Sequence, residues 1–156
     1  MPVATDTQQS NAVKRTHHLS PALAGHLGFL LAQAHLVSVS VADRALAPLQ
    51  LEIKQYVALA ILADDGHLSQ HQLGQRMRID RTTMVALIDT LETGGDVARH
   101  RNPQDRRAYA LQITRRGRTT LARAKRAIAT AEQEISDALS EPELRQLKHL
   151  LTRLLV

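Results

Sequence analysis

The 156-residue sequence contains no cysteine and almost no aromatic residue: one Phe, two Tyr and no Trp. Without cysteine the chain forms neither disulfides nor thiolate zinc sites, and it cannot sense peroxide through a thiol. This agrees with a reducing cytoplasm, where we expect the protein to act. Aromatic residues make up 2% of the chain although apolar residues make up 44%, so Leu, Ala, Ile and Val must build the core. Such a core is more typical of packed helices than of a β-sandwich.

Long apolar runs are also missing. The longest apolar stretch is interrupted by Gln33, His35 and two serines, which predicts that no helix spans a membrane. The first residues, MPVATDTQQSNAVKRTHH, lack the apolar centre of a signal peptide, and we expect a flexible tail over residues 1–19.

Acidic residues are nearly absent from one stretch of the chain. Residues 99–126 contain ten of the twenty Lys and Arg but a single acid, Asp105, so this stretch carries +9. The whole chain carries +5, which leaves −4 for the remainder. A solvated helix face usually mixes charges of both signs at i,i+4 spacing. The basic stretch therefore favours a polyanionic partner.

The hydrophobic spacing predicts a mainly helical chain with one small β-hairpin. Ser20-Pro21 predicts the start of a long first helix, which Pro48 ends. After it we expect helices over 52–63, from the capping box at 69–72, from the Asp80 cap to 94–95, from beyond Gly117 to about 139, and from 140 to the end; the two strands are expected over 97–101 and 108–113.

The short helix after Ser69, the turn at 78–79 and the helix capped by Asp80 form a helix-turn-helix candidate. The free N–H groups at the start of the second helix suit phosphate. Arg81, Thr82 and Thr83 are donors able to reach base edges in a major groove.

The hairpin that follows would make this unit a winged helix, because its arginines lie beside the second helix and can reach the neighbouring minor groove. Asp105 precedes Arg107 by two residues. Its carboxylate can hold that guanidinium in a bidentate pair and fix its direction.

Leu68–Gly117 resembles the winged helix-turn-helix of the MarR family of transcriptional regulators. The resemblance is carried by DRTTMVALIDTLE, followed by the wing and its exit, RNPQDRRAYALQIT-x-x-Gly. It implies a homodimer that binds a pseudo-palindromic operator in double-stranded DNA, usually as a repressor. It also implies a DNA-binding lobe over residues 51–117 and a helical dimerisation region over 20–50 and 118–156.

The resemblance assigns roles to single residues. Arg107, held by Asp105, would enter the minor groove, while Arg101 and Arg106 would touch phosphate or brace the wing. We expect contacts to DNA bases from the exposed start of the helix capped by Asp80, the recognition helix, and contacts to the DNA backbone from neighbouring positions. The first set is Arg81, Thr82, Thr83 and Ala86, and the second is Ser69, Gln70, Arg115 and Arg116.

One residue departs from the family pattern. The family normally has Gly-Leu-Val after the recognition helix, where the leucine anchors the wing, but this chain has Gly95-Asp96-Val97. Either Asp96 turns outward and the wing is looser, or it pairs with a nearby arginine.

Histidines offer a second class of site. His35 falls midway along the first helix, where the family forms a ligand pocket, and His26 and Arg44 are weaker candidates for the same pocket. A hydrogen-bonded structural histidine is the simpler interpretation of His35. His67 and His71 have i,i+4 spacing, but a helix cap separates them, so we expect neither a metal site nor a cofactor.

Three classes of function are weighed against these features. The first is a sequence-specific regulator that responds to a small effector, for which the expectation is an aromatic or phenolic molecule. The second is an architectural or weakly specific DNA-binding protein without an effector. The third is an enzyme, which we do not expect, because the sequence has no nucleophile elbow, phosphate loop or metal-ligand spacing.

Overall fold

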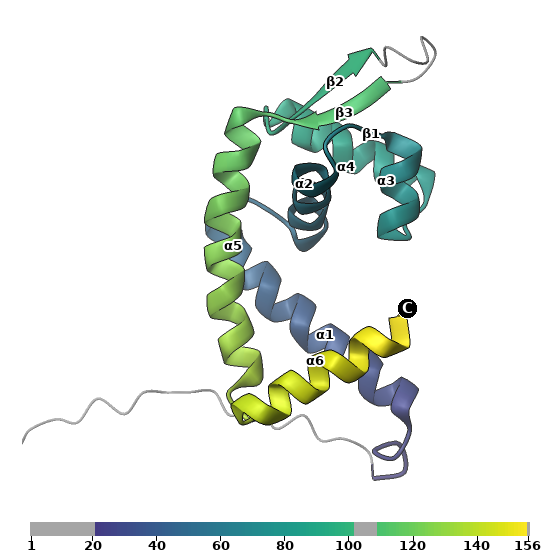
Figure 1. Cartoon of the computed structure of the whole chain (residues 1–156), viewed down its shortest axis with the longest axis vertical. Helices are drawn as coiled ribbons and strands as arrows, with labels where there is room; N and C mark the ends of the chain where they lie inside the picture. Colours follow the sequence, from purple (N-terminus) through teal and green to yellow (C-terminus); the bar gives the residue numbers. More distant parts are fainter. Residues whose placement is uncertain (1–20, 102–108, 156) are drawn as a thin grey trace, which may run out of the picture. The chain divides into compact units, whose positions relative to one another are not determined.

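The computed structural model describes residues 21–101 and 109–155 (Figure 1). The chain divides into two compact units, residues 1–33 and residues 34–156. The helices are α1 (Leu27–Leu46), the short 3₁₀ helix η1 (Ala47–Leu49), α2 (Ile53–Asp65), α3 (Gln70–Met77), α4 (Arg81–Thr93), α5 (Arg115–Ser136) and α6 (Glu141–Leu155); the strands are β1 (Leu68–Ser69), β2 (Val97–Arg101) and β3 (Tyr109–Ile113). This order confirms a mainly helical fold with a small wing.

The sheet has one strand more than the predicted hairpin. β3 pairs antiparallel with β2 from Val97 opposite Ile113 to Arg101 opposite Tyr109. On its other edge β3 pairs with the two-residue strand β1, with Leu68 opposite Leu111. Two residues are too few for a hydrophobic alternation to be recognised in the sequence. β1 thus joins the start of the helix-turn-helix to the wing.

A single aliphatic core holds the helix-turn-helix against the sheet. Its most deeply buried large side chains come from α1, α2, α3, α4, β2 and β3, and they are Leu46, Leu59, Leu62, Leu73, Met84, Ile88, Val97 and Leu111. Leu121 and Ala124 of α5 complete this core. Figure 1 shows α2, α3 and α4 under the sheet, and α5 starting at the sheet and running away from it. The aliphatic residues expected to build the core do build it.

Two predicted helix starts were wrong. Residues 21–25 form a turn, in which the His26 N–H donates to the Leu23 carbonyl at 2.9 Å, and α1 begins only at Leu27. Gly25 disfavours helix at that point, because glycine loses more backbone entropy than other residues. α5 begins at Arg115 instead of after Gly117, because the Thr114 side chain caps it by accepting the Gly117 N–H at 3.0 Å.

No single helix within the described residues is both long and apolar enough to cross a membrane. One pair does meet the length and composition criteria together: Leu27–Leu49 with Ile53–Asp65, which meet at a bend of 80°.

Candidate nucleic-acid interface

The helix-turn-helix is formed by two capped helices and a tight turn. Ser69 caps α3 through a capping box: its Oγ accepts the Gln72 N–H at 3.2 Å, and its own N–H donates to Gln72 Oε1 at 2.8 Å. α3 ends at Met77, and the C-cap residue Arg78 has a left-handed backbone (φ 53°) and directs the chain into α4. The predicted capping box and turn are confirmed.

Asp80 caps the recognition helix α4. Its carboxylate accepts the Thr83 N–H at 3.0 Å and the Thr83 hydroxyl at 2.6 Å. The hydrogen bond from the Thr83 side chain, followed by that from its backbone N–H, lowers the pKa of Asp80. Because the hydroxyl proton of Thr83 is used by the cap, its oxygen can meet DNA mainly as an acceptor.

The opposite face of α4 is open to solvent. Met84, Leu87, Ile88 and Leu91 are buried, and Arg81, Thr82 and Ala86 are exposed on the other side, with Thr83 half-buried. Val85 is also 40% exposed. Four predicted contact residues therefore lie along one helix N-terminus, and Val85 adds an apolar group of the kind that packs on a thymine methyl.

Arg99 of β2 links the wing to the recognition helix. Its Nη2 donates to Asp89 Oδ1 at 2.5 Å, and its Nη1 donates to Glu92. The hydrogen bond to Asp89 is the main reason that the pKa of Arg99 is raised. In the sequence Arg99 stands out only as part of the basic stretch. The i,i+3 spacing of Asp89 and Glu92 was the available signal for this pairing.

The tip of the wing lies outside the described residues. Arg101 is the last residue of β2 and is exposed. Asp105, Arg106 and Arg107 belong to the part of the wing that the structure does not describe, so the pairing of Asp105 with Arg107 stays a prediction.

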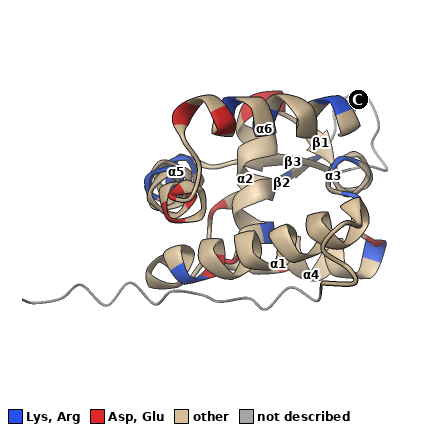
Figure 2. Ribbon diagram, turned by 90° about the horizontal axis from the view of Figure 1, so that it is seen from below, with Lys and Arg blue, Asp and Glu red and all other residues tan. Residues whose placement is uncertain are grey.

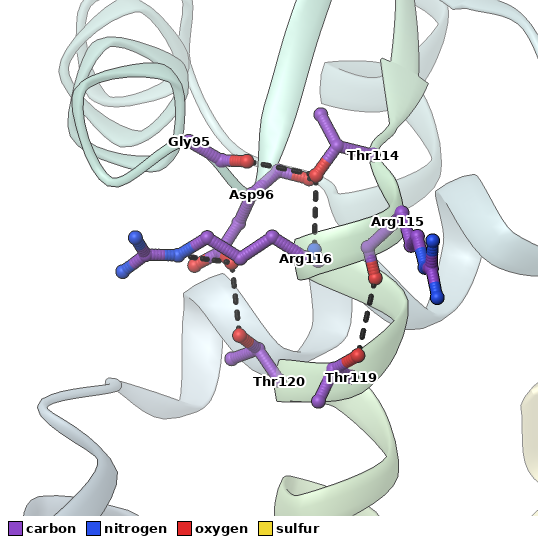
Figure 3. A network of polar contacts seen from close by, with 8 residues as sticks. Gly95, Asp96, Thr114, Arg115, Arg116, Thr119 and Thr120 are labelled. Atoms are coloured by element: carbon purple, nitrogen blue, oxygen red, sulfur yellow. Dashed lines mark hydrogen bonds and ion pairs between the residues drawn. The ribbon is translucent and has the colours of Figure 1, made fainter.

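At the base of the wing, Asp96 turns inward. It is only 8% exposed. Its Oδ1 accepts the Thr120 hydroxyl at 2.8 Å and lies 3.6 Å from Arg116 Nε (Figure 3). Of the two alternatives for this residue, pairing with a nearby arginine is the one observed.

The predicted DNA-backbone contacts have different surroundings. Arg115 and Arg116 are exposed at the start of α5. Ser69 and Gln70 are half-buried, and the Gln70 Nε2 amide is buried with no acceptor among the described residues. Gln70 lines a groove of about 720 Å³ together with Arg78, Arg81 and Val85. The amide would have to turn outward to reach a phosphate.

Charge is distributed unevenly over this part of the chain. Figure 2 shows basic positions on α5 and on α3, and acidic positions at the start of α6. α6 begins with Glu141 and Glu143 in its first turn. The first half of α5 carries Arg115, Arg116, Arg118, Arg123, Lys125 and Arg126 without an acid. The positive charge therefore continues from the wing into α5.

The three effector candidates have separate surroundings. His26 lies in the turn before α1, His35 is exposed on α1, and Arg44 donates to Glu134 of α5 at 2.9 Å. None of them lines the groove beside Gln70, nor the polar hollow of about 480 Å³ that includes Asp96, Arg116 and Arg123. Within residues 21–101 and 109–155, no three His, Asp or Glu side chains come together as a metal site.

Comparison with known proteins gives consistent matches. The model of the MarR family matches residues 51–109. A transcriptional regulatory protein for the hcr operon of Thauera aromatica is 33% identical over 85% of this chain and 80% of its own length. The HTH-type transcriptional repressor Rv2887 of Mycobacterium tuberculosis is 29% identical over 82% of this chain and 92% of its own. The repressor CouR, solved bound to a 23-mer DNA duplex, is 32% identical with a TM-score of 0.82, covering 88% of this chain and 99% of that one.

Proposed function

Because the chain belongs to the MarR family of transcriptional regulators, we propose that it is a homodimeric repressor that binds a pseudo-palindromic operator and is released by a small ligand. The family consists of regulators and not enzymes, as expected from the sequence. The exposed start of α4 is the main support for the DNA-binding surface, because it presents Arg81, Thr82 and Ala86 above a buried apolar face.

The proposed contacts divide into two groups. The start of α4 enters the major groove, where Arg81 and Thr82 read base edges and Ala86 and Val85 pack on thymine methyls. Arg101, Arg115 and the wing arginines meet phosphate or the minor groove. The repressor CouR bound to a DNA duplex supports this arrangement for a chain of the same fold. The name of Rv2887 supports repression over activation.

Dimerisation is proposed through residues 20–50 and 118–156. None of the described residues of α6 is buried, and its leucines repeat at helical spacing, with Leu150 46% and Leu154 60% exposed. An apolar stripe of this length requires a partner in water. Two recognition helices related by a two-fold axis would then read two half-sites about one DNA turn apart.

The test is selection of duplexes from a random library by the full-length protein, followed by footprinting on the selected sequence. We expect a two-fold symmetric footprint that survives competitor DNA. A collection of unrelated duplexes bound equally well would instead support an architectural, weakly specific DNA-binding protein.

The wing provides a sharper test, which uses the selected duplex. Arg107→Ala should weaken binding by roughly 1–3 kcal/mol and remove the preference for an A·T-rich flank. If Asp105 orients Arg107, Asp105→Ala should have the same two effects in a milder form. Simple electrostatics predicts the opposite, since the variant loses a negative charge near DNA. Tighter binding by Asp105→Ala, measured across salt concentrations, would contradict the orienting role.

The effector is proposed to be a small amphipathic, aromatic or phenolic molecule that binds near His35. His35→Ala should keep operator affinity and respond less to such a molecule, for example a benzoic acid carrying one hydroxyl group. An unchanged response would assign His35 a structural role.

A further inference from the structure

Asp96 joins three elements of the DNA-binding lobe. Its N–H donates to the Leu91 carbonyl of α4 at 2.9 Å, and its carbonyl accepts the Thr114 N–H at 3.0 Å. Its carboxylate accepts from Thr120 of α5. The first residue of the wing is thus tied to the end of α4 and to the first turns of α5.

The carboxylate needs its partners because it is buried. A buried, unpaired carboxylate is costly, whereas one that is hydrogen-bonded and ion-paired is tolerated. Among the described residues, the side chains of Thr120 and Arg116 meet it, at 2.8 Å and 3.6 Å. Arg116 remains 72% exposed, but the carboxylate is only 11% exposed. The buried carboxylate therefore has one fixed position, from which it attracts a largely exposed guanidinium.

The two arginines that open α5 have different surroundings. Figure 3 shows the Arg116 side chain extending to the side of Asp96, and the Arg115 side chain extending to the opposite side of the helix. Within the described residues no partner of the Arg115 guanidinium is found. The backbone carbonyl of Arg115 accepts the Thr119 hydroxyl. Arg115 and Arg116 are adjacent and carry the same charge, but among the described residues only Arg116 has an acidic partner.

We propose that Asp96 is a positioning residue of the DNA-binding surface: it draws the Arg116 guanidinium to the wing base, so that of the two arginines that open α5 it is Arg115 that meets a DNA phosphate. This inference rests on the proposed DNA-binding function. From the sequence alone, both arginines are expected to touch the DNA backbone. The ion pair with Asp96 gives Arg116 a different role from Arg115. Asp96, which departs from the family's Gly-Leu-Val pattern, thereby acquires a role at the wing base.

The salt dependence of binding separates the two arginines. The full-length protein is titrated with a fluorescent mixed-sequence duplex, and the logarithm of the binding constant is plotted against that of the salt concentration. Removal of one phosphate contact lowers the slope by about 0.9. For Arg115→Ala we expect this decrease once for each subunit on the duplex, and for Arg116→Ala we expect an unchanged slope.

A second comparison tests Asp96 directly. Asp96→Asn retains an acceptor for Thr120 but loses the charge that holds Arg116. In this background Arg116 is free to meet a phosphate, so Arg116→Ala should now lower the slope by about 0.9 for each subunit on the duplex. Asp89→Asn is the matched control, because it removes a carboxylate from α4 without touching Arg116, and in it Arg116→Ala should still leave the slope unchanged.

Three results would overturn the inference. They are a lower slope for Arg116→Ala in the parent, an unchanged slope for Arg115→Ala, and no effect of Arg116→Ala in the Asp96→Asn background. If Asp96→Asn fails to fold by circular dichroism, the two single arginine variants decide alone. A parent that binds no duplex would overturn the proposed function itself, which is a distinguishable result.

Discussion

At Gly117 the first turn of α5 lies directly against the backbone of Asp96. A Cβ added at this glycine would lie 2.1 Å from the Asp96 carbonyl oxygen and 2.8 Å from the Ile113 side chain. Backbone atoms cannot give way as a flexible side chain does. The glycine of the Thr-x-x-Gly wing exit is therefore required for close approach between α5 and the wing base.

Gly117→Ala should destabilise the fold by about 1–3 kcal/mol, the usual cost of overpacking a close contact. The measurement is urea unfolding at a fixed protein concentration. Gly28→Ala is the control, because a Cβ there meets no described atom within 4 Å, and alanine should be neutral or slightly stabilising in a helix. Equal unfolding midpoints for the parent and Gly117→Ala would contradict the close approach.

Arg99 compensates for two acids on the recognition helix. Without it, the carboxylate of Asp89, which is 56% exposed, would repel the DNA backbone, and β2 would lose its tie to α4. Arg99→Ala should therefore weaken operator binding about tenfold, or about 1.4 kcal/mol. Gel-shift titration checks this, and adding Asp89→Asn should restore part of the affinity.

Arg126→Ala is the matched control for Arg99, since it removes one positive charge from α5 instead of β2. It should weaken binding less than Arg99→Ala does. If the two variants weaken operator binding equally, Arg99 contributes only through its positive charge and not through its bonds to α4.

Among the elements, α4 depends on its N-cap. The folded-state pKa of Asp80 is lowered by its hydrogen bonds with Thr83. The cap therefore contributes stability above the unfolded-state pKa of about 3.9. The contribution is lost as the pH falls through the lower folded-state value.

Asp80→Ala should lower the urea midpoint at pH 7, and the difference from the parent should shrink as the pH falls below about 4. Asp64, an exposed acid in the last turn of α2, provides the control, since Asp64→Ala should change the midpoint little at either pH. If the difference in urea midpoint between Asp80→Ala and the parent grew as the pH fell, the result would contradict a lowered pKa of Asp80.

At the scale of the whole molecule, the exposed leucines of α6 predict a dimer. Sedimentation equilibrium at micromolar concentration should show twice the chain mass. Leu147→Glu combined with Leu150→Glu should produce a monomer, because charges would replace the apolar stripe. Operator affinity should then fall at least about 100-fold, since the two half-sites would be bound separately.

Gln146→Glu controls for the added charge on α6, as it changes a polar, exposed position of the same helix. It should remain dimeric. A parent that sediments as a monomer at this concentration would contradict both the dimer and the two-fold operator.

The sequence alone determined the element types, the capped helix-turn-helix and the two-stranded wing. These follow from local signals: the Ser69 and Asp80 caps, the spacing of Met84, Leu87, Ile88 and Leu91, and the strand alternation of 109–113. Such signals act within a few residues and are visible without the fold.

Only the tertiary structure decided the contacts between distant residues. The pairing of Leu68 in β1 with Leu111 in β3 joins parts of the chain that no local pattern connects. The bonds from Arg99 to α4 were indicated in the sequence only by the spacing of the two acids, which does not name their partner. Asp96 could be recognised as unusual, but its direction depends on Thr120, which lies 24 residues further along the chain. A side chain's direction depends on which partner the fold places beside it, because burial without a partner is unfavourable. The spacing of charges along the sequence does not contain that information.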